Sequence, residues 1–125
     1  MTITGLDRVA NGEVDFQGAK IALLAHPASI TKAVSHAAKV IQSNSSAKLT
    51  CLMGPQHGWF GDTQDNMIEW EGEEYKSTLP MYSLYGKHRE PTAEMLTDID
   101  VILVDLQDVG CRVYTFIQTL YLTMK

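Results

Sequence analysis

The chain has 125 residues, of which 45% are hydrophobic and 20% charged, and this composition fits one globular domain rather than a disordered segment. Its formal net charge of −5 argues against nucleic-acid binding, because phosphate contacts need clustered Lys and Arg residues and only 10 are spread along the chain. Since no apolar run approaches membrane-spanning length and the N-terminal residues carry no signal-peptide pattern, we expect a cytoplasmic protein that contacts neither nucleic acid nor membrane.

Apolar patterns of two kinds alternate along the chain. Short continuous apolar runs are typical of strands buried on both faces, whereas apolar residues spaced three and four apart are typical of helices. In chain order, the sequence predicts a strand over 20–25, a helix over 30–41, strands over 48–53 and 80–85, a short helix over 91–96, a strand over 101–104 and a helix after Gly110.

Local signals support these boundaries. Ser29 or Thr31 is available to cap the first helix, and Thr92 lies near the start of the second. Pro80 can open a strand or lie in an edge strand, but it cannot lie in the middle of a sheet. The stripe expected on the last helix consists of Val113, Ile117, Leu120 and Met124.

Strands that alternate with helices predict βαβ units and a mainly parallel sheet with flanking helices, so the expected fold class is α/β. Five strand residues are then expected to be almost completely buried: Ile21, Leu23, Leu52, Ile102 and Val104. The chain ends on a helix that should return to another strand, so we expect the domain to continue after residue 125. A sheet without its neighbours exposes apolar surface, and we therefore expect association into homo-oligomers.

The segment Gly54–Trp70 directly follows a predicted strand and combines a histidine, two tryptophans, three glycines and three carboxylates. Long loops of this composition inside a compact domain are usually functional. In parallel sheets, ligands bind beyond the carboxyl ends of the strands. That rule brings the segment together with three other polar groups of residues, namely His26, residues 82–86 and residues 105–108.

Each of these polar groups also has a purely structural explanation. His57 could be a loop residue bonded to backbone, but Gln56, Asp62 and Asp65 lie close in sequence and favour ligand contact or proton transfer.

Other candidate residues leave two interpretations open. Asp105 and Asp108 follow a strand and precede a helix, so both could be N-cap residues instead of site residues. Trp59 and Trp70 could belong to the core or could hold one face of a sugar ring. Solvent-facing positions are expected for His36 and His88.

Signals for metals and cofactors are missing from the sequence. The two cysteines, Cys51 and Cys111, lack the close spacing of a metal-binding pair, and we predict that both are buried free thiols. No motif for a dinucleotide, a nucleoside triphosphate or zinc is present, so we predict neither a cofactor nor a metal site.

Five segments in a fixed order resemble one family. They are residues 5–8 (GLDR), 20–31 (KIALLAHPASIT), 54–61 (GPQHGWFG), 79–86 (LPMYSLYG) and 100–117 (DVILVDLQDVGCRVYTFI). Together they make nearly the whole chain similar to the exo-β-N-acetylmuramidase family of the NamZ type, long catalogued as a domain of unknown function. The resemblance implies a Rossmann-like catalytic domain, of which residues 1–125 would be the N-terminal portion, with the remainder and a smaller C-terminal domain absent.

The resemblance also implies a glycoside hydrolase that releases terminal N-acetylmuramic acid from peptidoglycan fragments. Family members commonly carry Pro-Glu-His-Gly with glutamate as the favoured catalytic acid, whereas this chain has Gln56, whose amide cannot deliver a proton at neutral pH. Either another acid acts, such as Asp62, Asp65 or Glu69, or the chain binds sugars without cleaving them. The second of the two carboxyl groups that such hydrolysis needs would fall beyond Lys125.

The leading hypothesis assigns the acid/base role to Asp62 or Asp65. His57 and Gln56 would bind or orient the sugar and water. Further substrate contacts are expected from His26, Asp105, Gln107, Asp108 and Arg112, the last as a partner of the lactyl carboxylate. The alternatives are a non-catalytic module that binds muramyl sugars and an α/β interaction domain without small-molecule chemistry.

Overall fold

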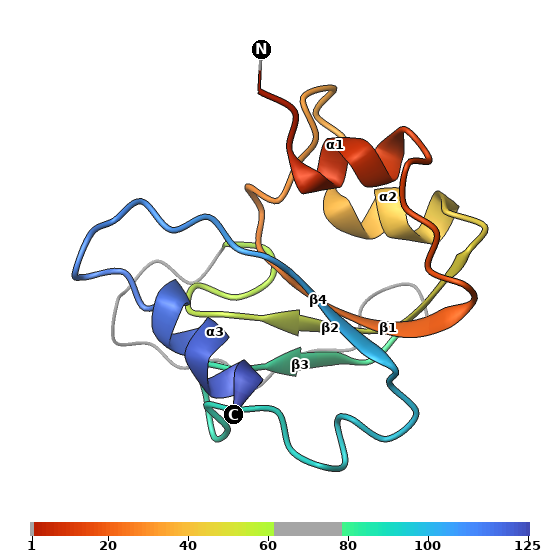
Figure 1. The fold of residues 1–125 in the computed structure, drawn as a ribbon. Coiled ribbons are helices and arrows are strands. Elements are labelled where there is room, and N and C mark those ends of the chain that lie inside the picture. Colours follow the sequence, from red (N-terminus) through yellow and green to blue (C-terminus); the bar gives the residue numbers. More distant parts are fainter. Residues whose placement is uncertain (1, 62–78) are drawn as a thin grey trace.

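A parallel four-stranded sheet forms the centre of the structure, a computed structural model that describes residues 2–61 and 79–125 (Figure 1). The elements in chain order are α1 (Gly5–Ala10), β1 (Ala19–Ala25), α2 (Ala37–Ser43), β2 (Ala47–Gly54), β3 (Met81–Ser83), β4 (Val101–Asp105) and α3 (Phe116–Met124). The strand order is β3-β2-β1-β4, and every neighbouring pair is parallel. The predicted α/β class with a parallel sheet and flanking helices is confirmed, as are the four predicted strands.

Side chains from the central strands alternate between two packed layers, as the two-residue period of a strand requires. Leu23, Ala25 and Leu52 pack with α2 on one face of the sheet. Ala22 and Leu24 point to the other face, where the chain between β3 and β4 covers them. α1 and α2 lie together on the first face, and α3 lies on the opposite side (Figure 1). The strands therefore read as continuous apolar runs because both faces are covered.

Burial along the strands follows their position in the sheet. Ile21, Leu23 and Leu52 are almost completely buried, as predicted. For β4 the prediction was wrong, since Ile102 is only partly buried and Val104 is 37% exposed. In the described part of the chain β4 pairs with β1 alone, so one of its sides lacks a neighbouring strand.

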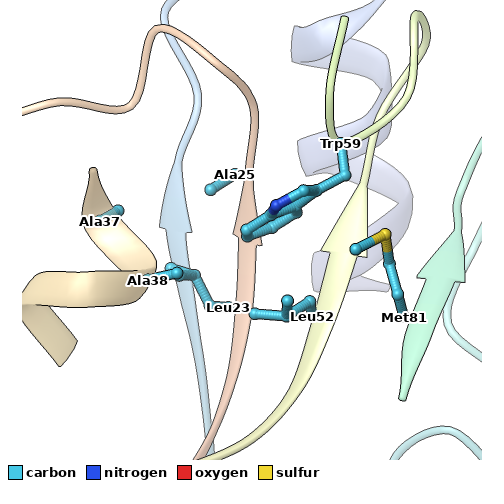
Figure 2. Packing of buried hydrophobic residues seen from close by; sticks show 7 residues of the cluster. All are labelled: Leu23, Ala25, Ala37, Ala38, Leu52, Trp59 and Met81. Carbon is cyan, nitrogen blue, oxygen red and sulfur yellow. The ribbon is translucent and has the colours of Figure 1, made fainter. Parts of the chain in front are cut away.

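Trp59 belongs to the core on the first face of the sheet. Its side chain is 4% exposed, and Figure 2 shows the ring beside Ala25, Leu23 and Leu52. A ring with so little exposed surface cannot form an open platform for a sugar. Of the two roles considered for this tryptophan, the structure therefore supports the core role.

The helix predicted over 30–41 forms only in its second half, as α2. Ser29 and Thr31 do not cap it: the Ser29 hydroxyl donates to the Asp105 carbonyl, and Thr31 Oγ1 accepts from the Ser35 backbone at 3.0 Å. Val34 has a φ of 59°, which no α-helical residue adopts. The helical spacing of the apolar residues therefore did not decide the structure of residues 30–36, because Ser29 is hydrogen-bonded to the end of β4.

Two other helix predictions also need correction. Residues 91–96 form turns instead of a helix, although Thr92 Oγ1 accepts from the Met95 backbone as a capping residue would. On α3 the buried residues are Phe116 and Thr119. Of the apolar stripe predicted on this helix, Val113 precedes α3, and Ile117 and Met124 are exposed.

The two cysteines differ in environment. Cys51 is a buried free thiol, as predicted, and burial raises its pKa to about 11. Cys111 is exposed, so its predicted burial was wrong. It lies in the segment between β4 and α3, which runs over the surface.

Leu52 offers a direct test of the core. Its side chain is completely buried between the sheet and α2, so Leu52→Ala should lower the free energy of unfolding by about 2–5 kcal/mol. Urea titration followed by circular dichroism measures this change. Lys48→Ala on the same strand, at an exposed position, is the matched control and should change stability by less than about 0.5 kcal/mol. Equal losses for the two variants would contradict the assigned core.

Candidate functional site

A cavity of about 320 Å³ lies beyond the carboxyl ends of β1, β2 and β4. This is the edge at which parallel sheets bind ligands. The residues that line the cavity are His26, Pro27, Ala28, Gln56, His57, Gly58, Gly61, Gln107, Val109, Tyr114 and Phe116. Four residues predicted from the sequence to contact substrate or take part in chemistry are therefore brought together: His26, Gln56, His57 and Gln107.

His26 is the first residue after β1 and is held by its neighbours. The backbone N–H of Gln107 points at His26 Nε2 at 3.4 Å, and the Phe116 ring meets the imidazole edge-on at 4.9 Å between centroids. Burial lowers the pKa of His26, and the nearby charge of His36 lowers it further. A neutral imidazole that is partly buried at a cavity wall can serve as a hydrogen-bonding group without adding charge to the cavity.

A set of hydrogen bonds ties the end of β1 to the end of β4. Ser29 is completely buried, accepts from the His26 backbone at 3.0 Å and donates to the Asp105 carbonyl. Gln107 Nε2 donates to the Ala28 carbonyl at 2.9 Å. These bonds fix the relative position of the two strand ends that carry the candidate site.

His36 proves to be an internal structural residue, not the solvent-facing one predicted. Its Nδ1 accepts from the Ala38 backbone at 3.2 Å and so caps α2, and its Nε2 lies 3.0 Å from the His26 carbonyl. Because Nδ1 accepts, Nε2 is the nitrogen that donates to that carbonyl. Trp59 packs edge-on against the ring, with the centroids 5.4 Å apart. His36 thereby anchors the loop that carries His26.

Gln56 and His57 enter the cavity from the loop after β2. Gln56 is 6% exposed, and its Oε1 accepts from the Thr115 hydroxyl at 2.7 Å. His57 is partly buried and has a left-handed backbone with φ 71°. Gly61, also left-handed, lies so close to Pro27 that an added Cβ would be 2.9 Å from the proline ring. The loop is therefore packed closely against the residues that follow β1.

Three predicted site residues lie elsewhere. Asp105 lines a separate cavity of about 410 Å³ between α1, α2 and the sheet, where burial raises the pKa of its carboxyl group. Asp108 is exposed and accepts from the Gly110 backbone at 3.2 Å, closing a turn rather than capping a helix. Arg112 is exposed and is not among the residues that line the His26 cavity. The structure therefore does not gather these three with Gln56 and His57.

Asp62 and Asp65, the predicted acid/base residues, lie outside the described residues, as do Glu69 and Trp70. Three residues of the cavity wall or its support were missed by sequence reasoning, namely Tyr114, Thr115 and Phe116. They directly follow the loop after β4, so the rule about strand ends could have found them.

Within residues 2–61 and 79–125, no group of three or more His, Cys, Asp or Glu side chains is arranged to hold a metal ion. In that same part of the chain, no helix has both the length and the apolar character needed to cross a membrane.

The lowered pKa of His26 makes stability depend on pH. The folded state binds the proton of His26 less tightly than the unfolded chain does. Neutral His26 is therefore compatible with the full free energy of unfolding above the unfolded pKa, and part of that free energy is lost as the pH falls. The midpoint of thermal unfolding should therefore drop between pH 7.5 and 5.5, and His26→Gln should reduce that drop. Differential scanning fluorimetry measures it, with His88→Gln as the histidine control. A drop that His26→Gln leaves unchanged would contradict this assignment.

Comparisons with known proteins agree with one another. Residues 21–125 match the family described as exo-beta-N-acetylmuramidase NamZ, N-terminal. Over 123 residues the chain is 37% identical to the peptidoglycan beta-N-acetylmuramidase NamZ of Bacillus subtilis (strain 168), covering 98% of this chain and 30% of that protein. The crystal structure of a DUF1343 family protein from Bacteroides fragilis NCTC 9343 matches with a TM-score of 0.79 and 33% identity, again over 98% of this chain and 30% of the other. The chain thus spans about 30% of the length of these relatives.

Proposed function

Because this chain belongs to the NamZ exo-β-N-acetylmuramidase family, we propose that it is the N-terminal portion of a Rossmann-like catalytic domain in a longer glycoside hydrolase. That hydrolase releases terminal N-acetylmuramic acid from peptidoglycan fragments. The observation that carries the proposal is the cavity beyond the strand ends, where Gln56 and His57 lie beside aromatic rings. The chain that forms this cavity is 37% identical to a peptidoglycan muramidase.

The chemistry of the cavity suits a sugar. Sugar rings present apolar C–H faces and polar hydroxyl edges, and they bind where aromatic side chains stand beside hydrogen-bonding groups. Tyr114 and Phe116 supply ring surface, while Gln56, His57 and Gln107 supply donors and acceptors. In this proposal these polar side chains bind and orient the sugar and the attacking water.

The acid/base role needs a carboxyl group. We assign it to Asp62 or Asp65, which follow directly in sequence on the loop that carries Gln56 and His57. Hydrolysis of a glycosidic bond needs two carboxyl groups about 5–9.5 Å apart, and the second belongs in this proposal to the part of the longer protein outside residues 1–125. Asp108 and Arg112 remain proposed substrate contacts, on the exposed loop after β4.

A second candidate function is binding of muramyl sugars without cleavage. Gln56 favours it, because this amide lies in the cavity wall and cannot donate a proton as an acid does. The two functions share a ligand and differ only in turnover.

The test compares binding with release. The longer protein is incubated with a chromogenic N-acetylmuramide, and residues 1–125 are titrated with N-acetylmuramic acid under nuclear magnetic resonance. Release together with shifts at Gln56 and Tyr114 supports the hydrolase. Shifts without release support the binding module. The absence of both release and shifts would refute both functions.

We also propose that residues 1–125 associate in solution. Val101 and Val104 on β4 are 38% and 37% exposed, and Ile117, Tyr121 and Met124 expose apolar surface on α3. Apolar surface of this kind favours pairing with a second copy, and so does the edge of β4 that has no neighbouring strand in the described part of the chain. Sedimentation velocity should show dimers or larger species at micromolar concentration, and a monomer throughout would contradict this proposal.

The cytoplasmic location expected from the sequence stays a prediction.

A further inference from the structure

The imidazole of His26 is held in one orientation at the wall of the candidate cavity. The backbone N–H of Gln107 donates to its Nε2 at 3.4 Å, and the Phe116 ring meets it edge-on. The backbone of His26 is held as well, because its N–H donates to Ser29 Oγ and its carbonyl accepts from His36 Nε2. These contacts come from separate segments of the chain, so the orientation of the ring follows from the fold.

One of these contacts determines which ring nitrogen of neutral His26 carries the proton. A neutral imidazole has one N–H group and one acceptor nitrogen, so the nitrogen that accepts a hydrogen bond has no proton. Because Nε2 accepts from the Gln107 backbone, the proton is on Nδ1. Neutral His26 therefore presents Nδ1–H as a hydrogen-bond donor.

The same contact opposes a second proton on the ring. A proton on Nε2 would face the Gln107 N–H, so the imidazolium form must give up this hydrogen bond. Burial acts in the same direction, because it lowers the pKa of His26, and the charge of nearby His36 lowers it further. An anionic acceptor would favour the imidazolium form, whereas a hydroxyl or amide carbonyl oxygen leaves the neutral form intact. An uncharged oxygen is therefore the better partner for this side chain.

We propose that neutral His26 contacts the sugar through Nδ1–H, which donates to an uncharged oxygen, either a hydroxyl or the acetamido carbonyl. Its Nε2 stays bonded to the Gln107 backbone, and this bond positions the ring. The place of His26 supports such a contact, since it lines the cavity at the edge where parallel sheets bind ligands. The inference rests on the proposed function, because that function supplies the sugar.

Nuclear magnetic resonance of the imidazole nitrogens of residues 1–125 tests the tautomer before any sugar is added. At pH 7.5, His26 should give the signal of a protonated Nδ1 and that of an unprotonated Nε2. His26→Gln assigns these signals by removing them. A proton on Nε2 would overturn the inference, whether or not any sugar binds.

Titration with three sugars then identifies the group that Nδ1–H contacts. N-acetylmuramic acid carries an acetamido group and a lactyl carboxylate, N-acetylglucosamine lacks the lactyl carboxylate, and muramic acid lacks the acetyl group. The Nδ1 proton signal should move downfield with both acetylated sugars, while Nε2 stays unprotonated. A further shift with muramic acid assigns the oxygen to a hydroxyl, and no shift with it assigns the acetamido carbonyl. A response only to the two sugars with a carboxylate, or protonation of Nε2 on binding, would overturn the uncharged acceptor.

Two substitutions separate the ligand contact of His26 from its structural contact. Asparagine can place its amide near the position of Nδ1 and glutamine near that of Nε2, because glutamine is longer by one carbon. His26→Gln should weaken binding roughly 2- to 12-fold, the range for one neutral hydrogen bond, and His26→Asn should weaken it less. The midpoint of thermal unfolding should fall more in His26→Asn, since only the glutamine reaches the Gln107 N–H.

His88→Gln is the matched control, because His88 lines a different cavity. It should leave the dissociation constants of all three sugars unchanged.

The failures of the inference and of the proposed function are distinguishable. If the sugars shift Tyr114 signals but leave those of His26 unmoved, the sugar binds without this contact and the inference alone is wrong. If His26→Asn loses as much binding as His26→Gln, Nδ1 is not the contacting atom. If no sugar shifts any signal of the protein, the proposed function fails for this chain, and the contact is wrong with it.

Discussion

In the longer protein, Asp62→Asn or Asp65→Asn is expected to lower kcat by roughly 10²- to 10⁴-fold, the scale of losing a general acid. Gln56 cannot be that acid, and these are the nearest carboxyl groups that follow it in sequence. Steady-state kinetics on a chromogenic N-acetylmuramide measure the loss. The Michaelis constant should change far less than kcat, because the carboxyl acts on the bond being broken.

Substitutions of Gln56 are the matched control for this prediction. Gln56→Ala should mainly raise the Michaelis constant, since an amide that orients the sugar contributes binding. If the chain instead binds without cleaving, Gln56→Glu is expected to restore measurable hydrolysis. Should both aspartate variants stay fully active, neither is the acid, and the role moves to Asp105, to Asp108 or to the sequence beyond residue 125.

Purified residues 1–125 are expected to release no N-acetylmuramic acid from the same substrate, whereas the longer protein of the proposal is expected to release it. The physical reason is that hydrolysis of a glycosidic bond needs two carboxyl groups, and this chain is proposed to supply one. Because rate enhancements by enzymes exceed about 10⁶-fold, the difference should be all or nothing in a standard assay.

Folding must be checked in parallel, because an unfolded chain would also be inactive. Circular dichroism and the Leu52→Ala comparison provide that check. Turnover by residues 1–125 at a rate close to that of the longer protein would show that the active site has been misplaced.

The sheet was predictable because its signal is local and strong. Residues 20–25 and 48–53 are apolar runs bounded by turn residues, and such runs become buried parallel strands wherever both faces are covered. Val104 shows the limit of this reasoning. A run of apolar residues indicates a strand, but it does not say on how many sides that strand has neighbours, and β4 pairs with β1 alone in the described part of the chain.

The start of α2 could not be predicted correctly, because it depends on contacts between residues that are distant in sequence. Ile30 and Val34 have helical spacing, yet Ser29 bonds the Asp105 carbonyl 76 residues away and His36 takes the capping position. No local pattern reports such bonds. The spacing of apolar residues on α3 did not identify its buried face for a related reason. Such spacing indicates an apolar stripe, but it does not say which part of the protein packs against that stripe.

The candidate site was predictable in outline through the topology of the sheet. The rule about strand ends placed His26, Gln56, His57 and Gln107 together, and the structure has all four in one cavity. The hydrogen bond from Thr115 to Gln56 could not be predicted, because it joins residues that are 59 positions apart in the sequence.

The backbone of His57 carries a cost that bears on how this site can change. Its φ of 71° is a conformation that costs a side-chain-bearing residue about 1–2 kcal/mol and costs glycine almost nothing. Replacing His57 with glycine would therefore relieve strain while removing the imidazole. Under the role proposed for His57 in binding the sugar, His57→Gly would relieve backbone strain and remove that contact, so stability and binding would change in opposite directions at this position.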